Sequence, residues 1–238
     1  VEQFASATSA GVGVRVIAGN RQGFAYAGTL DADVMAETLG EARDNATFAT
    51  DDEWLGLAEP DGLAVPALDL YRESLTRVST DAKIDLALEL ERAVRAADPR
   101  ITGVESADYA DGVSEGAVVS TTGIRTYGRE TSCYVAAHCV ATDGDDTQTG
   151  FGFSVGRTLD DLDVSVAAGD AARRATRLLG ATKPASGRVT VVLDPYVTAQ
   201  FLGIIGSTLS GEAVLKGRSL FADRLGESVA AAGFTLVD

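Results

Sequence analysis

One stretch of the sequence, SGEAVLKGRS from Ser210 to Ser219, has the residue types of a phosphate-binding loop. A Walker A loop has four residues between its first glycine and the Gly-Lys-Ser/Thr that follows, because its backbone N–H groups and its lysine must surround the phosphates. Here five residues separate Gly211 from Gly217, and the cation after Gly217 is Arg218. The stretch also follows a predicted helix, whereas a phosphate loop leaves a strand and opens a helix. We therefore predict a glycine-punctuated loop that binds no nucleotide.

Two thiols and an imidazole, from Cys133, His138 and Cys139, lie within seven residues and suggest a zinc site. The surrounding pattern predicts a strand, in which successive side chains point to opposite faces. The two cysteines then share one face, and His138 lies on the other. At about 3.3 Å per residue the sulfurs would be about 20 Å apart, beyond the reach of a disulfide or a shared metal. We predict that both thiols are buried as small apolar groups.

Other motifs are also interpreted as structural. His138 is the only histidine, so this chain cannot supply two histidine ligands, and no Gly-x-Ser-x-Gly elbow accompanies it. DGDD at 143–146 lacks the acidic residue of a calcium loop at the twelfth position, where Ser154 falls, and predicts a hairpin tip. GFGFSVG at 150–156 lacks the dinucleotide-binding spacing and predicts a strand whose glycines form a bulge or allow close packing. Carboxylates could still perform acid–base chemistry, but 35 acidic residues offer no unique pair.

The charge and composition narrow the classes of partner. The 238 residues carry 20 basic and 35 acidic side chains, a net charge of −15. Nucleic-acid binding needs a positive surface that displaces counterions, so we expect no direct nucleic-acid role. No apolar run approaches the ~18 residues of a membrane span, and no signal peptide is visible, so we expect no membrane association. Two cysteines make no disulfide framework, which favours a reducing cytoplasm. Both ends are expected to be cut from a longer chain.

The first half of the chain predicts a hairpin, two helices and irregular chain. Residues 11–29 alternate on either side of a Gly19-Asn20 turn, and a helix capped by Asp31 follows to about Phe48. Residues 50–78 are predicted to be a loop. The clearest helix is STDAKIDLALELERAVRAADP, capped by Ser79 or Thr80 and stopped by Pro99. Its expected core-facing residues are Ile84, Leu88, Leu90 and Val94.

The second half predicts an antiparallel meander followed by alternating elements. Residues 101–157 contain alternating, glycine-punctuated segments. A helix over 165–179 ends at Gly180, RVTVVLD at 188–194 predicts a strand, and a helix begins near Pro195. This order indicates an α+β fold with mixed or antiparallel sheets, packed helices and two subdomains. We predict an N-terminal domain over 1–180, and over 181–238 the start of a second, truncated domain in the order strand, helix, loop, strand.

The chain from Arg188 onward resembles the family of TldD and TldE (PmbA) proteins, which are labelled modulators of DNA gyrase. The resemblance lies in a VVLDP strand, a helix, SGEAVLKGRS, SLFADRLGE and a short final strand. GVGVRVIAGNRQGFAYAGTLD near the start and the helix that follows DDLD fit the same family. The resemblance covers essentially the whole chain, although family members are about twice as long. This chain is similar to their N-terminal and central part.

The resemblance implies a zinc metalloprotease that acts on short or unfolded peptides. Its catalytic subunit carries His-Glu-x-x-x-His on the helix after the VVL strand, which places a ligand and a general base on one helical surface. In this sequence Gly203 and Ile204 fall where the His-Glu pair would be, and Thr208 falls where the second histidine would be. No catalytic or metal-binding residue is therefore carried over. This departure is similar to the TldE/PmbA side of the family, which implies that zinc lies in a catalytic partner subunit and that this chain holds no cofactor.

We accordingly expect a non-catalytic subunit of a cytoplasmic TldD/TldE-type protease, in a homo- or hetero-oligomer with a TldD-like subunit and with peptides as substrates. Lys216 and Arg218 are candidate contacts to a partner or a peptide carboxylate, and a purely structural loop is the alternative. The full set of candidate binding residues is Ser210, Gly211, Lys216, Gly217, Arg218 and Ser219. Two other functions stay open: a hydrolase with its own site in a missing C-terminal half or built from carboxylates here, and a binding module that acts without a protease.

Overall fold

The chain groups by spatial contact into two units. The computed structural model describes residues 1–64 and 66–237. One unit contains Val1–Ser6 and Ala58–Pro184, and the other contains Ala7–Leu57 and the chain from Ala185 onward. We describe each unit by itself. The predicted division into domains over 1–180 and 181–238 differs from this contact grouping, because the N-terminal hairpin groups with the C-terminal segment, and as a statement about folding domains it stays a prediction.

The first unit is built on an antiparallel meander, which confirms the prediction for residues 101–157. Its strands are β3 (Ile101–Val119), β4 (Arg125–Asp143) and β5 (Asp146–Gly156), hydrogen-bonded in that order. The two long strands join at a turn over 120–124. The second turn, between the paired residues Asp143 and Asp146, is the hairpin tip expected at DGDD. The glycines of residues 101–157 indicated more and shorter strands. In the structure the strands continue through most of these glycines, and the meander has three long strands.

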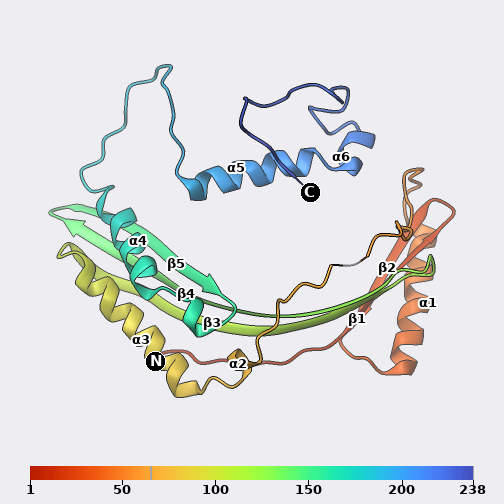
Figure 1. The fold of residues 1–238 in the computed structure, drawn as a ribbon, viewed down its shortest axis with the longest axis horizontal. Helices are drawn as coiled ribbons and strands as arrows, with labels where there is room; N and C mark the ends of the chain where they lie inside the picture. The colour runs from red at the N-terminus through yellow and green to blue at the C-terminus, as the bar shows by residue number, and fades with distance from the viewer. Residues whose placement is uncertain (65, 238) are drawn as a thin grey trace. The chain divides into compact units, whose positions relative to one another are not determined.

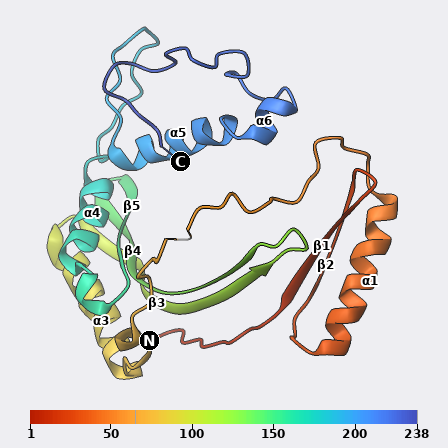
Figure 2. The same cartoon turned by 45° about the vertical axis from the view of Figure 1, so that its right-hand side comes forward.

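Only the inner half of β4 belongs to the core. From Thr131 to Ala141 every second residue is buried, including Cys133 and Cys139, whereas His138 lies on the exposed face. This alternation confirms the predicted placement of the two thiols. Residues 111–119 of β3 and 125–130 of β4 are exposed. They continue beyond β5 as a two-stranded ribbon (Figure 2).

Helix α3 (Thr80–Ala97) packs on the buried face of this sheet together with α4 (Val164–Thr176) (Figure 1). The predicted cap is confirmed, since the Ser79 Oγ accepts a hydrogen bond of 3.2 Å from the backbone N–H of Ala82. Leu90 and Val94 are fully buried, as expected from their spacing of four. The prediction for Leu88 is wrong. It is 38% exposed, because residues two apart on a helix point to nearly opposite sides.

Helix α4 (Val164–Thr176) approaches the sheet closely because both surfaces carry small residues. Its buried face consists entirely of alanine: Ala167, Ala168, Ala171, Ala172 and Ala175. Across from it, a Cβ atom on Gly152 would lie 2.0 Å from the carbonyl oxygen of Ala167, and one on Gly150 would lie 2.2 Å from that of Ala171. Of the two roles predicted for these glycines, a bulge or close packing, the distances confirm close packing. Gly180 does not end the helix directly, but it has a φ of +72° after the helix has ended at Thr176.

The second unit begins with the predicted hairpin and helix. Strands β1 (Val12–Ala18) and β2 (Arg21–Ala27) pair antiparallel on either side of Gly19 and Asn20. Both turn residues have positive φ, as a two-residue hairpin turn requires. Helix α1 (Ala32–Phe48) follows, and the Asp31 side chain accepts hydrogen bonds from two backbone N–H groups of its first turn.

Two predicted strands are absent from the described residues. Residues 188–194, RVTVVLD, and 234–237 form no ladder, and Val192 is 91% exposed. The prediction was wrong because residue types that favour a strand are not sufficient: a strand forms only when its backbone pairs with another strand, and these residues pair with none in the described chain. The expected loop over 50–78 is irregular in its described residues, 50–64 and 66–78, apart from the short helix α2 (Glu73–Thr76). None of the described helices combines the length and apolar character needed to cross a bilayer.

Candidate functional site

Helix α5 (Pro195–Thr208) is the element on which the family resemblance places the catalytic motif. It begins where predicted: the Asp194 carboxylate accepts a hydrogen bond of 2.9 Å from the backbone N–H of Tyr196, and Pro195 occupies the first helical position. Its sequence, PYVTAQFLGIIGST, contains no imidazole, thiol or carboxylate. None of its residues is buried.

The residues of α5 do not fit a zinc ion. Gly203 offers no side chain and has open space around it, and Ile204 presents an aliphatic group that is 65% exposed. The Thr208 hydroxyl donates to the carbonyl oxygen of Ile205 at 2.7 Å. Protein zinc sites use histidine, cysteine or carboxylate ligands. Across residues 1–64 and 66–237, no three such side chains gather closely enough to hold a metal ion.

The segment after α5 forms a short helix, α6 (Gly211–Leu215), where a loop was predicted. The Ser210 Oγ caps it by accepting from the backbone N–H of Ala213 at 3.2 Å. At its other end Gly217 has a φ of +66°, and the N–H of Arg218 donates to the carbonyl oxygen of Ala213 at 2.8 Å. This arrangement is a Schellman motif, which explains a glycine at position 217. The prediction was wrong because a glycine at each end of a short segment is also compatible with one capped helical turn.

The six predicted binding residues have different structural roles. Gly211 opens α6, and Ser219 accepts a backbone hydrogen bond from Phe221 at 3.0 Å. Ser210 and Gly217 form the two caps, and the Arg218 side chain is exposed. Lys216 is the only one of the six that lines the pocket described below. Their role in binding a peptide or a partner stays a prediction.

Lys216 links α6 to the irregular segment that follows α1. Its Nζ lies 2.8 Å from a carboxylate oxygen of Asp52 and 3.1 Å from one of Glu212. The hydrogen bond from Lys216 lowers the pKa of Asp52, and the backbone N–H of Trp54 acts in the same direction. The hydrogen bonds to Asp52 and Glu212 in turn raise the pKa of Lys216. The three side chains are therefore a charged cluster held by its own ion pairs.

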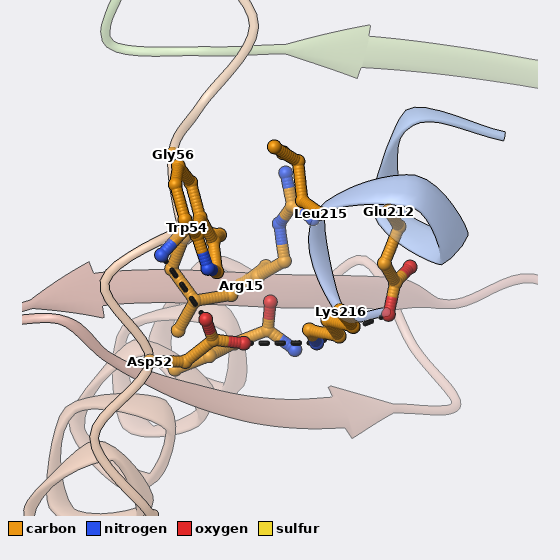
Figure 3. A pocket seen from close by; sticks show the side chains of 9 residues that line it. Arg15, Asp52, Trp54, Gly56, Glu212, Leu215 and Lys216 are labelled. Carbon is orange, nitrogen blue, oxygen red and sulfur yellow. Dashed lines mark hydrogen bonds and ion pairs between the residues drawn. The ribbon is translucent and has the colours of Figure 1, made fainter. Parts of the chain in front are cut away.

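A pocket of about 440 Å³ lies above this cluster (Figure 3). The side chains of Arg15 and Leu215 stand opposite the indole of Trp54, and the Asp52–Lys216 pair lies below them. The complete lining is Arg15, Gln22, Asp52, Trp54, Leu55, Gly56, Glu212, Leu215 and Lys216. Sequence reasoning missed Arg15, Asp52 and Trp54. The only local signal was a lone tryptophan in an irregular, acidic segment, and nothing in the sequence brings residue 52 to residue 216.

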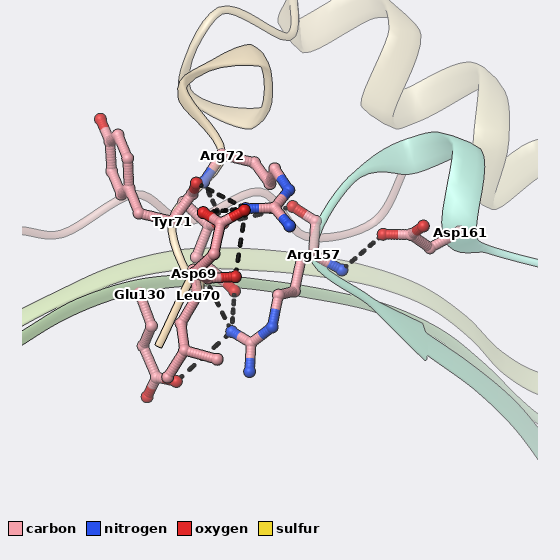
Figure 4. A network of polar contacts seen from close by, with 8 residues as sticks. Asp69, Leu70, Tyr71, Arg72, Glu130, Arg157 and Asp161 are labelled. Carbon is pink, nitrogen blue, oxygen red and sulfur yellow. Dashed lines mark hydrogen bonds and ion pairs between the residues drawn. The ribbon is translucent and has the colours of Figure 1, made fainter. Parts of the chain in front are cut away.

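A second polar cluster, in the other unit, fastens the segment before α2 to strand β4 (Figure 4). The Arg157 guanidinium donates to the carbonyl oxygens of Leu70 and Thr131, both at 3.0 Å, and lies 3.5 Å from the Glu130 carboxylate. Asp161 accepts from the backbone N–H of Arg157 at 2.9 Å, and this bond is the first cause of the lowered pKa of its carboxyl group. The Arg157 guanidinium donates hydrogen bonds to backbone carbonyls and a carboxylate of the same unit. We therefore assign this cluster a structural role.

The cysteines and His138 are also held in structural environments. The Cys133 thiol donates to the carbonyl oxygen of Thr158 at 3.2 Å, and burial raises the pKa of both thiols. His138 stacks on Phe151 with 6.0 Å between ring centroids. This environment therefore favours the protonated thiol of both cysteines and not the thiolate that makes a cysteine reactive.

Comparison with family models matches the chain in three consecutive parts. Residues 1–46 match the PmbA/TldA metallopeptidase domain 1, residues 73–179 match the central domain, and residues 186–238 match the C-terminal domain.

Named relatives cover almost all of this chain. Metalloprotease PmbA of Escherichia coli O157:H7 is 26% identical over 228 residues, which are 92% of this chain and 49% of the relative. A metalloprotease of Methanocaldococcus jannaschii is 26% identical over 247 residues, covering 100% of this chain and 53% of the relative. The chain thus spans about half the length of the curated relatives it matches.

Solved structures share the fold. A protein of Bacteroides thetaiotaomicron, named as a modulator of DNA gyrase, has a TM-score of 0.81 at 23% identity over 93% of this chain and 51% of its own. TldE from Thermococcus kodakarensis has a TM-score of 0.63 at 21% identity over 90% of this chain and 48% of its own. At these identities the likeness concerns the fold.

Proposed function

Because the chain belongs to the PmbA/TldD family of metallopeptidase-like proteins, we propose that it acts as a non-catalytic, PmbA/TldE-like subunit of a TldD/TldE-type zinc peptidase. In this proposal the partner subunit holds the zinc and cleaves short or unfolded peptides. This chain contributes surfaces for assembly and for peptide binding. We place the complex in the cytoplasm, as the composition suggests, and assign it no direct contact with nucleic acid, in keeping with the net charge of −15.

The observation that carries the proposal is the chemistry of α5. The family resemblance places a metal ligand and a general base at positions 203 and 204 and a second ligand at 208. This chain has glycine, isoleucine and threonine there. Neither Gly203 nor Ile204 has an atom able to bind zinc or accept a proton, and the Thr208 hydroxyl already donates within the helix. The motif that would supply hydrolysis is thus replaced on the helix that would carry it.

The exposed apolar side chains of this region support a role in assembly. Ile204 is 65% exposed and Phe201 is 52% exposed on α5, and Val192 is 91% exposed just before it. Large apolar side chains that gather on one exposed element mark interaction surfaces. We therefore expect α5 to be covered in the working complex.

The proposal is tested with the protein purified alone and together with a TldD-like subunit from its own host. Zinc is measured by inductively coupled plasma mass spectrometry, and cleavage is measured on an unstructured fluorogenic peptide. We expect no stoichiometric zinc and no cleavage from the protein alone, and cleavage after mixing. Zinc and cleavage in the isolated protein would instead establish a hydrolase with its own site. Lack of association with any peptidase subunit would favour an independent binding module.

Two matched variants test the part played by α5. Ile204→Asp places a charge on its exposed apolar surface and is expected to abolish co-purification with the peptidase subunit. Val166→Asp makes the same kind of change at a 50% exposed position of α4 and is expected to leave association intact. Equal loss in both variants, or in neither, would contradict the assignment of α5 as an assembly surface.

A further inference from the structure

We propose that the pocket formed by Arg15, Trp54 and Leu215 binds a carboxylate, and that the C-terminal carboxylate of a short peptide is its principal source. The inference rests on the proposed function only for the choice of a peptide as the ligand. The carboxylate preference comes from the pocket itself. An acidic side chain within a peptide offers the same group, and the test below separates the two sources.

Arg15 is the cation of the pocket that is free to bind a ligand. Lys216 is committed to Asp52 at 2.8 Å and to Glu212 at 3.1 Å. In the described chain, by contrast, no carboxylate lies within ion-pair distance of the exposed Arg15 guanidinium. A guanidinium presents its N–H donors in a planar fork that matches the two oxygens of a carboxylate. Arg15 therefore gives the pocket an unused cationic donor suited to this ligand.

The charges of the lining select a singly charged anion. Arg15 and Lys216 carry two positive charges, and Asp52 and Glu212 carry two negative charges, so the lining is neutral overall. A carboxylate adds one negative charge next to Arg15. A phosphate would bring nearly two, close to two carboxylates that are already present, and like charges at short range repel. The same charge pattern that fits a carboxylate thus disfavours a phosphate.

The pocket also offers apolar contact and a preformed shape. The indole of Trp54 is 54% exposed and the Leu215 side chain is 50% exposed, and they face each other across the opening (Figure 3). The backbone at Trp54 is held by its N–H, which donates to the Asp52 carboxylate at 3.0 Å, and the N–H of Asp52 donates to the carbonyl oxygen of Asn20 at 2.8 Å. The volume of about 440 Å³ falls within the range of small-ligand pockets. A peptide end with an apolar last residue fits this combination.

Trp54 supplies a direct readout, because it is the only tryptophan in the chain. Three tetrapeptides without tryptophan or tyrosine are titrated against the 238-residue chain while tryptophan fluorescence is recorded. The first has a free C-terminus and no acidic side chain, the second is its C-terminal amide, and the third is an amide with one internal glutamate. We expect saturable binding of the first and at least tenfold weaker binding of the second. Binding of the third as tight as the first would identify acidic side chains as an additional source.

Substitutions at position 15 test whether the Arg15 guanidinium binds the peptide carboxylate. Arg15→Gln is expected to weaken binding of the free-acid peptide at least tenfold, and Arg15→Lys is expected to restore it in part. Arg43→Gln, an exposed arginine of α1 outside the pocket, is the matched control and should bind as the unmodified chain does. Circular dichroism confirms that each variant is folded. The proposal is overturned if the neutral amide binds as tightly as the acid, if no peptide binds up to millimolar concentration, or if Arg15→Gln binds normally. Since neither zinc nor a peptidase subunit is present, this result is independent of the association test.

Discussion

Replacing Gly152 by alanine is expected to destabilise the first unit strongly, because the new methyl group has no room against α4. The Cβ atom would lie 2.0 Å from the carbonyl oxygen of Ala167 and 2.6 Å from the backbone nitrogen of Ala171. Both are backbone atoms, so no side chain can rotate away. Ordinary van der Waals contact begins near 3.4 Å, so moving from 2.0 Å to 3.4 Å requires α4 to withdraw by 1.4 Å.

The loss of stability in Gly152→Ala depends on the contacts that α4 would lose by withdrawing from the sheet. A gap of 0.5–1 Å already loses about a quarter to a half of the dispersion energy of the facing atoms. The face that would withdraw consists of five buried alanines, and none of them has a longer side chain that could fill the space. Overpacking of a core costs about 1–3 kcal/mol and occasionally more. With backbone atoms on the other side of the clash, we expect a loss of about 3 kcal/mol or more, or a fall in Tm of roughly 6–12 °C for a chain of this size.

The assay is urea denaturation followed by far-UV circular dichroism, with thermal unfolding as a second measurement. Trp54 fluorescence would not serve, because that residue belongs to the other unit. Gly169→Ala is the matched control: it lies on the exposed side of the same helix with open space around it, and it should raise stability by up to about 1 kcal/mol. An unchanged midpoint for Gly152→Ala, or an equal loss in Gly169→Ala, would refute the close-approach argument.

Two further predictions concern the core and the acid stability of the same unit. Leu90→Ala, at a fully buried position, should lower the free energy of unfolding by about 2–5 kcal/mol, whereas Leu88→Ala, at a 38% exposed position, should lower it by less than about 1 kcal/mol in the same urea titration. The hydrogen bonds from Arg100 lower the pKa of Asp98 from 3.8 to about 2. Ionised Asp98 therefore stabilises the fold above about pH 4, and this contribution disappears as the pH falls toward 2. The difference in Tm between the unmodified chain and Asp98→Asn should accordingly be present at pH 5 and smaller at pH 2, and a difference independent of pH would contradict the assignment.

The sequence predicted the features that depend on neighbouring residues. The alternation from Thr131 to Ala141 indicated a strand with one buried face, since a period of two can be seen within a few residues. Asp31 and Ser79 marked the starts of two helices, because a cap is formed by a side chain and the backbone two or three residues later. A third helix was expected to begin near Pro195. The glycines at 150–156 indicated either a bulge or close packing, and neither the choice between the two nor the identity of the helix they face could be determined from the sequence.

The remaining features depend on contacts between distant segments. RVTVVLD has the composition of a strand, but a strand exists only when it pairs with another strand, and within the described residues it pairs with none. The link between Asp52 and Lys216 joins the first and last thirds of the chain, and no spacing rule predicts it. Arg15 alternates with valines in a hairpin, a pattern typical of any solvent-facing residue. The pocket was therefore beyond sequence reasoning even though each of its elements, except α6, was expected.

The exposed ribbon formed by residues 111–119 and 125–130 has a consequence for the dynamics of the protein. Its cohesion comes from the backbone ladder and from cross-strand pairs such as Tyr127 with Glu115, whose hydroxyl–carboxylate distance is 2.9 Å, and not from a buried face. Its amide hydrogens should therefore exchange with solvent far sooner than those of Val135 or Cys139, which open only when the core does. The β3–β4 hairpin consequently combines a base whose hydrogen bonds open only with the core and an arm whose ladder can open locally while the core stays closed.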